Sequence, residues 1–192
     1  WSRQWGVTRN PWNNDFTSGG SSGGSSASLA SGTSTICTGS DIGGSIRIPA
    51  STCGLVGYKP PYGRNPEEAV FNLDFYCHTG PLARSVKDAI RLQNVMCGPS
   101  PKDIATLRPK LVLPYEYQPI KDWKIAYSPN LGCFEVDPEV EKNTLASLEV
   151  FKSLGATIEE VDLSWGPEVL EAGLAYLGHI FGAAMQDELE RH

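Results

Sequence analysis

The stretch that decides the fold is GSDIGGSIRIPASTCGLVGYKP, residues 39–60. It joins a Gly/Ser turn to Ile, Val, Leu and Cys residues that suit a buried core, so it is not a flexible linker. A second string, GGSSGGS at residues 19–25, lies upstream of it. Two Gly/Ser turns embedded in core-forming sequence predict that the backbone approaches another group closely at these points.

Three glycine-based motifs can be compared with these strings. A phosphate loop of the Walker type needs a lysine after its glycines, and a dinucleotide fingerprint needs GxGxxG; neither pattern is present. Gly19, Ser21 and Gly23 do satisfy GxSxG, the nucleophile elbow of α/β-hydrolases. An elbow follows a buried strand, however, and residues 13–18 are mostly polar. A serine esterase with its nucleophile at Ser21 therefore stays an alternative.

Composition restricts the class of partner. The 192 residues are 40% hydrophobic, enough for one sizeable core, and they form one domain or part of a larger one. With 16 basic and 22 acidic residues the net charge is -6, which gives no electrostatic footprint for nucleic acid or an anionic membrane surface. The most apolar stretch, residues 169–185, is interrupted by Glu171 and His179, so no transmembrane span is expected. A small or neutral partner is favoured.

The cysteines and histidines give no sign of a metal site. The five cysteines are odd in number, without a CxxC pair or clustered histidines, so we expect no metal and no cofactor, and we expect reduced thiols in a cytoplasmic protein. Cys53, His78 and His179 are interpreted as structural residues, with His78 in a turn. Trp5 and Trp12 are candidates for an acyl pocket or for the core.

Periodicity and capping residues predict the elements of the second half. The expected elements are a capped helix over 85–97, a loop over 101–119, a strand over 123–127, a helix over 137–154, a strand over 156–163 and a helix over 168–190. Residues 27–60 suit short strands with a closely packed helix, whereas residues 1–16 show no period. The β-α-β succession implies a sheet flanked by helices.

With these motifs in view, the chain resembles the amidase signature family. The match runs through NPWN (10–13), both Gly/Ser strings, GYKPPYGR (57–64) and HTGPLARSV (78–86), in the order and spacing of that family. The resemblance implies an α/β class fold, an α/β/α sandwich with a mixed central sheet. It also implies that residues 1–192 are part of a single domain, with a glycine-serine core at 17–64 and a β-α-β and helical continuation at 84–192.

The same resemblance implies the chemistry of a Ser, cis-Ser, Lys triad. Ser45 would be the nucleophile, and Ser21, after a cis peptide bond from Gly20, would relay its proton to a neutral lysine. Four backbone N–H groups would form the oxyanion hole: those of Ile42, Gly43, Gly44 and Ser45. Supporting hydrogen bonds would come from Gly20, Ser22, Ser40, Asp41 and Arg47.

The lysine of that triad is not expected in this chain. None of the residues that precede Ser21 is a lysine, and every lysine present lies downstream, starting with Lys59. The activity implied is hydrolysis of a small-molecule carboxamide to a carboxylate and ammonia or amine, with a homodimer as a candidate assembly. Alternatives are the glutaminase-like subunit of an aminoacyl-tRNA amidotransferase and a non-catalytic fragment. Against the former, FNLDFYCHTGP at 71–81 differs from the FASSLDQIGP-like stretch typical of that subunit.

Overall fold

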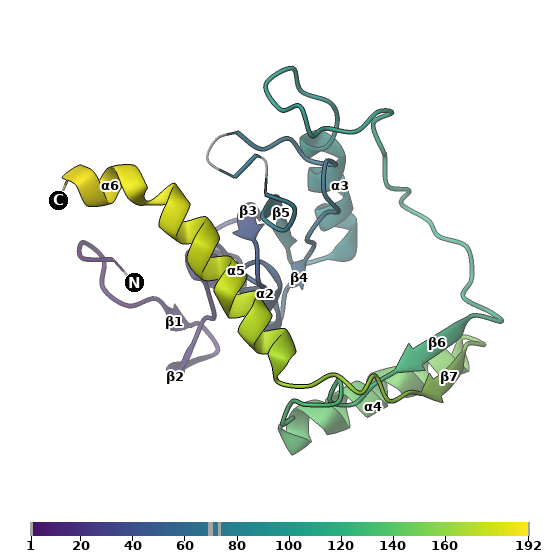
Figure 1. Ribbon diagram of the computed structural model, residues 1–192. Helices are drawn as coiled ribbons and strands as arrows, with labels where there is room; N and C mark the ends of the chain where they lie inside the picture. Colours follow the sequence, from purple (N-terminus) through teal and green to yellow (C-terminus); the bar gives the residue numbers. More distant parts are fainter. Residues whose placement is uncertain (1, 69–70, 73, 192) are drawn as a thin grey trace. The chain divides into compact units, whose positions relative to one another are not determined.

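The structure is a computed structural model that describes residues 2–68, 71–72 and 74–191, and it divides into two compact units, Trp1–Tyr115 and Glu116–His192 (Figure 1). Each unit is described by itself. The first unit contains β1 (Arg9–Asn10), β2 (Asn13–Thr17), α1 (Gly23–Ala30), β3 (Ile36–Asp41), α2 (Arg47–Thr52), β4 (Val56–Gly57), β5 (His78–Ala83) and α3 (Val86–Met96).

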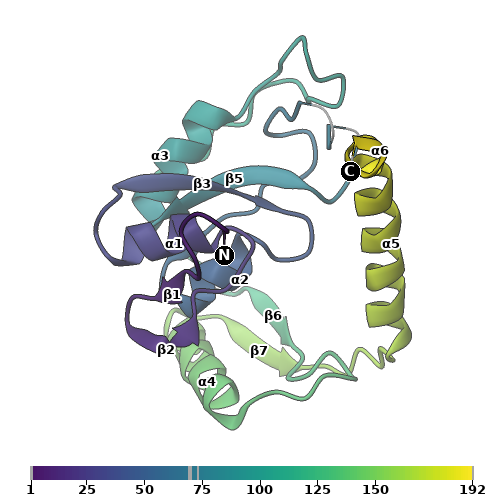
Figure 2. The same ribbon diagram turned by 90° about the vertical axis from the view of Figure 1, so that its left-hand side faces the viewer.

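A three-stranded antiparallel sheet is the centre of the first unit. β5 pairs with β3 from Asp41 opposite His78 to Ile36 opposite Ala83, and its other edge pairs with β4. Figure 2 shows β3 and β5 side by side. β5 is buried along almost its whole length, and both α1 and α3 contact it. A strand buried on both faces needs cover on both, which the helices provide.

The core of this unit lies beside the residues of the glycine-serine motif. Leu29 of α1, Leu82 of β5, Ile46 and Ala50 form one buried cluster. Ile46 directly follows Ser45 and is fully buried. Because a packed core side chain has little freedom to move, this burial holds the backbone of Ser45 against the sheet.

The N-terminal segment contains strands that no sequence period marks. Residues 9–17 form an antiparallel hairpin in which β1 pairs with β2, with Arg9 opposite Thr17. Every residue of β2 is exposed, so no apolar alternation marks this strand in the sequence. The expected turn at His78 is wrong, because His78 is the first residue of β5.

The helix predicted over residues 85–97 is confirmed as α3, Val86–Met96. The Ser85 Oγ accepts a hydrogen bond from the Asp88 N–H at 3.2 Å and donates one to the Asp88 carboxylate at 2.7 Å. Gly98 follows the helix with a φ of 130°, a conformation that a side chain disfavours. The predicted capping signals therefore mark both ends of this element.

The second unit contains a β-α-β element followed by two helices. Its elements are β6 (Lys124–Tyr127), α4 (Pro138–Ser153), β7 (Thr157–Glu160), α5 (Glu168–Ala184) and α6 (Gln186–Arg191). β6 and β7 are parallel, with Ile125 opposite Ile158, and α4 is the connection between them. The Asp137 carboxylate caps α4 by accepting from the Glu139 N–H at 2.8 Å. The predicted β-α-β succession is confirmed.

The predicted loop is confirmed, whereas the last predicted helix is divided in two. The loop expected over residues 101–119 contains no helix or strand, but the single helix expected over 168–190 is divided at Met185 into α5 and α6. The α/β class is confirmed. The strands of the described residues form three sheets, with a parallel pair in one and antiparallel pairs in the other two. Among these residues no helix has the length and apolar character needed to cross a membrane.

Candidate active site

The predicted nucleophile Ser45 lies in a tight connection between a strand and a helix. β3 ends at Asp41 and α2 begins at Arg47, so residues 42–46 make the turn that carries Ser45. Gly44 has a φ of 124°, a conformation that glycine adopts readily. A Cβ on Gly44 would also lie 2.6 Å from Cδ1 of Ile48, so a larger residue here would displace that side chain.

Asp41 holds this turn together from its centre. Its buried carboxylate accepts hydrogen bonds from the N–H groups of Gly44 at 2.7 Å, Ile46 at 3.1 Å and Arg47 at 3.2 Å. The Arg47 guanidinium adds two more, each at 2.9 Å, in a bidentate pair. Burial favours the neutral acid, but the bonds from Arg47 and the three amides outweigh it and lower the pKa of Asp41 to about 2.

The second string is attached to this turn by its backbone. The Ser22 N–H donates to the Ser45 carbonyl at 3.2 Å, and the Ser22 Oγ donates to the Ser40 carbonyl at 3.4 Å. A Cβ on Gly39 would lie 2.5 Å from the Ser22 Oγ, so glycine permits this close approach. The structure thus brings together the Gly20–Ser22 and Ser40–Ser45 segments. The expected cis peptide bond between Gly20 and Ser21 is present.

These contacts reduce the set of N–H groups proposed for the oxyanion hole. The N–H of Gly44 is used by Asp41, which leaves the N–H groups of Ile42, Gly43 and Ser45. Within the part of the chain that the structure describes, these three N–H groups have no hydrogen-bond acceptor. Backbone N–H groups that converge in a turn make an anion-binding concavity.

The side chains interpreted as structural have structural partners. The His78 imidazole Nε2 is hydrogen-bonded to the Phe75 carbonyl at 3.0 Å, and burial lowers the pKa of His78. Burial raises the pKa of the Cys53 thiol, which disfavours the reactive thiolate. Trp5 and Trp12 are 83% and 73% exposed, so neither belongs to the core.

The GxSxG alternative requires a buried strand before Ser21. A strand, β2, does precede Ser21, but all of β2 is exposed, whereas the elbow of an α/β-hydrolase follows a buried strand. His179 is hydrogen-bonded through Nδ1 to the Ala175 carbonyl of its own helix at 2.8 Å. The strand and this histidine therefore give the elbow interpretation no support.

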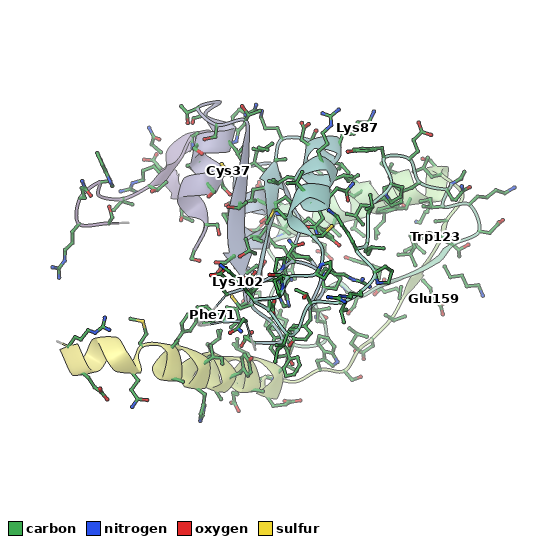
Figure 3. The ribbon with its side chains drawn as sticks, turned by 90° about the horizontal axis from the view of Figure 1, so that it is seen from above. Cys37, Phe71, Lys87, Lys102, Trp123 and Glu159 are labelled. Carbon is green, nitrogen blue, oxygen red and sulfur yellow. The ribbon has the colours of Figure 1, made fainter. Side chains whose placement is uncertain are left out.

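Two lysines of the first unit lie at exposed positions outside the two glycine-serine strings. Figure 3 shows Lys87 at the exposed start of α3 and Lys102 in the loop that follows this helix. Lys102 forms an exposed ion pair with Glu68 at 2.9 Å. Lys59 is half-buried and acts electrostatically on Cys77 and His78. That the catalytic lysine comes from outside residues 1–192 stays a prediction.

Comparison with known proteins decides the family. A family model described as Amidase matches residues 2–189. The chain belongs to the amidase family. A bacterial aryl acylamidase of the amidase signature enzymes has a solved structure that superposes with a TM-score of 0.89 at 36% identity, covering 97% of this chain and 39% of the acylamidase. The resemblance to amidase signature enzymes and the fold class are thereby confirmed.

The relatives of this chain include an amidotransferase subunit and an acylamidase. A glutamyl-tRNA(Gln) amidotransferase subunit of Carboxydothermus hydrogenoformans is 43% identical over 81% of this chain and 33% of its own length. An acylamidase of Rhodococcus erythropolis is 38% identical over 84% of this chain and 35% of its own length. The chain thus spans about a third of these relatives.

One set of contacts near the site was not predicted from the sequence, which had suggested only an acyl pocket or the core for Trp12. Asn10 and Trp12 belong to the NPWN motif, and Thr52 ends α2, yet all three are hydrogen-bonded to residues far away in the sequence. The motif itself was the available signal. Its partners could not be read from the sequence because they lie 34 to 42 residues away.

Proposed function

We propose that the complete protein hydrolyses a carboxamide through an acyl-enzyme on Ser45. The observation that supports this most directly is the hydrogen bond from the Ser22 N–H to the Ser45 carbonyl. It joins the segment of the proposed relay, Ser21, to the segment of the proposed nucleophile. The N–H groups of Ile42, Gly43 and Ser45 have no other acceptor among the described residues and supply the oxyanion donors of the proposal.

The proposed reaction has two balanced stages. The Ser45 Oγ attacks the amide carbonyl, its proton passes to the Ser21 Oγ, and Ser21 passes its own proton to a neutral lysine outside these residues. The tetrahedral oxyanion is held by the N–H groups of the turn. It collapses, and the C–N bond breaks as ammonia or an amine leaves with a proton from the relay. Water then cleaves the acyl ester, releasing the carboxylate and restoring the serine.

The test of the proposed function uses the complete polypeptide that contains residues 1–192. We expect Ser45→Ala to abolish both amide hydrolysis and covalent labelling by a fluorophosphonate, with a rate at least about a hundredfold lower, because the nucleophile is removed. Ser31→Ala is the matched control, since Ser31 is exposed at the end of α1 and bonds only locally. Labelling that persists in Ser45→Ala and disappears in Ser21→Ala would instead favour the esterase alternative.

The amidotransferase relatives favour a second candidate, a glutaminase function within an amidotransferase. A 43% identity to one such relative supports it, whereas the FNLDFYCHTGP sequence favours a stand-alone amidase. Two substrates separate the candidates: release of ammonia from glutamine supports the glutaminase, and cleavage of an anilide or another simple carboxamide supports the amidase. A protein that binds an amide without turnover would support a non-catalytic role.

The assignment of both units to one amidase domain belongs to the same proposal. One family model extends across both of them, which supports a single domain. The proposed partner is a small-molecule amide. A cytoplasmic location, a homodimer, and the absence of nucleic-acid binding stay predictions from composition and family.

A further inference from the structure

The C-terminal end of helix α2 is hydrogen-bonded to Ser18, which lies between β2 and the relay segment. The Thr52 Oγ donates a hydrogen bond to the carbonyl of Ser18 at 2.8 Å, and the Cys53 thiol lies 3.5 Å from the same oxygen. Ser18 is 2% exposed and Cys53 is fully buried, so water does not compete for this carbonyl. The Thr52 hydroxyl also lies 3.2 Å from the Ile48 and Pro49 carbonyls, but Ser18 is its shortest contact.

The β1–β2 hairpin binds the same end of α2. The amide of Asn10 donates to the carbonyl of Thr52 at 2.8 Å and to that of Thr17 at 3.3 Å, and the indole N–H of Trp12 donates to the carbonyl of Cys53 at 2.9 Å. The last carbonyls of a helix have no partner within the helix. Asn10 and Trp12 therefore satisfy carbonyls that would otherwise need water, and they fix the position of this helix end.

The other end of α2 is tied to the same segment. There the Ser22 N–H donates to the Ser45 carbonyl, just before the helix begins. Residues 18–22 thus lie along α2, from its C-terminal end to its N-terminal end. A Cβ on Gly19 would lie 2.8 Å from the Pro49 Cα, so this segment is packed directly on the helix.

Residues 18–22 are fastened at both ends of α2, through the Ser18 carbonyl at one end and the Ser22 N–H at the other. A segment that is fastened at both ends cannot shift along the helix without breaking one of its attachments. Ser21 lies between these attachments.

We propose that Thr52, supported by Asn10 and Trp12, is a positioning residue that sets Ser21 relative to Ser45. This inference rests on the proposed function, because it assigns Thr52 to the alignment of the relay with the nucleophile. Helix α2 acts as the spacer: its N-terminal end follows Ser45, and its C-terminal end holds Ser18. Thr52 itself touches no substrate.

The test compares three substitutions at the end of α2 in the complete polypeptide. Thr52→Val removes the donor and keeps a branched side chain; we expect kcat to fall by about tenfold to a hundredfold with KM changed less than about threefold, because proton relay depends on alignment. Fluorophosphonate labelling should slow in parallel. Thr52→Ser keeps the hydroxyl and should restore kcat to within about threefold. Ser51→Ala is the matched control, since its hydroxyl bonds only to the Ile48 carbonyl.

Three results would overturn the inference: a wild-type kcat in Thr52→Val, an equal loss in Ser51→Ala, or no rescue by Thr52→Ser. If Thr52→Val does not fold, Trp12→Phe decides, because it removes one donor from a side chain that is 73% exposed. A several-fold lower kcat at unchanged KM supports the proposal, and a wild-type kcat overturns it. Ser45→Ala is assayed in parallel: hydrolysis that persists there contradicts the proposed function itself, whereas loss there with full activity in Thr52→Val contradicts only the positioning role.

Discussion

At the scale of single residues, Asp41 is the side chain on which the turn of Ser45 depends. It accepts five hydrogen bonds, three from backbone N–H groups of that turn and two from Arg47. The sequence resemblance already placed Asp41 and Arg47 near the site. Their contacts now show a physical role, in which a buried carboxylate orders the backbone beside the proposed nucleophile.

The lowered pKa of Asp41 predicts a pH-dependent stability. The folded-state value of about 2 lies below the ordinary value of 3.8, so the ionised carboxylate stabilises the fold above about pH 4, and this contribution is lost as the pH falls toward 2. The shift corresponds to about 2 kcal/mol. We expect Asp41→Asn to lower the denaturation midpoint in urea at pH 7, with a smaller difference from wild type near pH 2.

The control for this experiment is Asp15→Asn, at an exposed position of β2. It should leave the midpoint unchanged at both pH values, because surface substitutions of this kind rarely change stability by more than about 0.5 kcal/mol. An Asp41→Asn protein as stable as wild type at pH 7 would contradict the anchoring role of this carboxylate.

At the scale of elements, α3 shows how local signals and tertiary contacts combine. Ser85 and Asp88 cap its first turn, while Ala89 and Ile90 are buried and the helix contacts β5. The cap and the apolar face belong to the same stretch of sequence, so this helix could be predicted in type and in both ends. β5 could not be predicted in this way. Its sequence HTGPLA contains a glycine and a proline, and both residues argue against a strand in the interior of a sheet.

The cap of α3 gives a prediction about stability. Ser85→Ala removes the acceptor for the Asp88 N–H and should destabilise the protein by about 1 kcal/mol. It should also raise the pKa of Asp88 toward its ordinary value, because the hydrogen bond from Ser85 is the main cause of its lowered pKa. Thermal denaturation and NMR titration of Asp88 measure the two effects. Ser85→Thr keeps the hydroxyl, and equal loss of stability in both variants would show that the cap is not the cause.

At the scale of the whole molecule, the helices of the second unit expose large apolar side chains. Among the described residues of α4 and α5 none is buried, and Val169, Leu170 and Leu174 of α5 are exposed. The chain spans about a third of the length of the family relatives. We therefore expect these faces to pack against further parts of the complete protein.

This expectation can be measured on residues 1–192 expressed alone. Because large exposed apolar patches promote association, this piece should bind the dye ANS and form oligomers in light scattering. The complete polypeptide, under the same conditions, should bind little dye. A monomeric piece with no dye binding would contradict the idea that these helix faces are interfaces.

The sequence by itself determined the family, the proposed nucleophile and relay, and the elements with strong local signals. The helix of residues 86–96 and the β-α-β element of residues 124–160 were predictable because caps, apolar spacing and glycine stops are local properties of the chain.

Only the tertiary structure decided how the proposed site is held. The hairpin at residues 9–17 has an exposed, polar second strand, so no hydrophobic period marks it. The bonds from Ser22 to Ser45, Thr52 to Ser18 and Asn10 to Thr52 join residues more than twenty positions apart. Such contacts depend on which surfaces meet after folding. No local pattern of residue types encodes them, and the orientation of Ser21 beside helix α2 is a property of the folded unit alone.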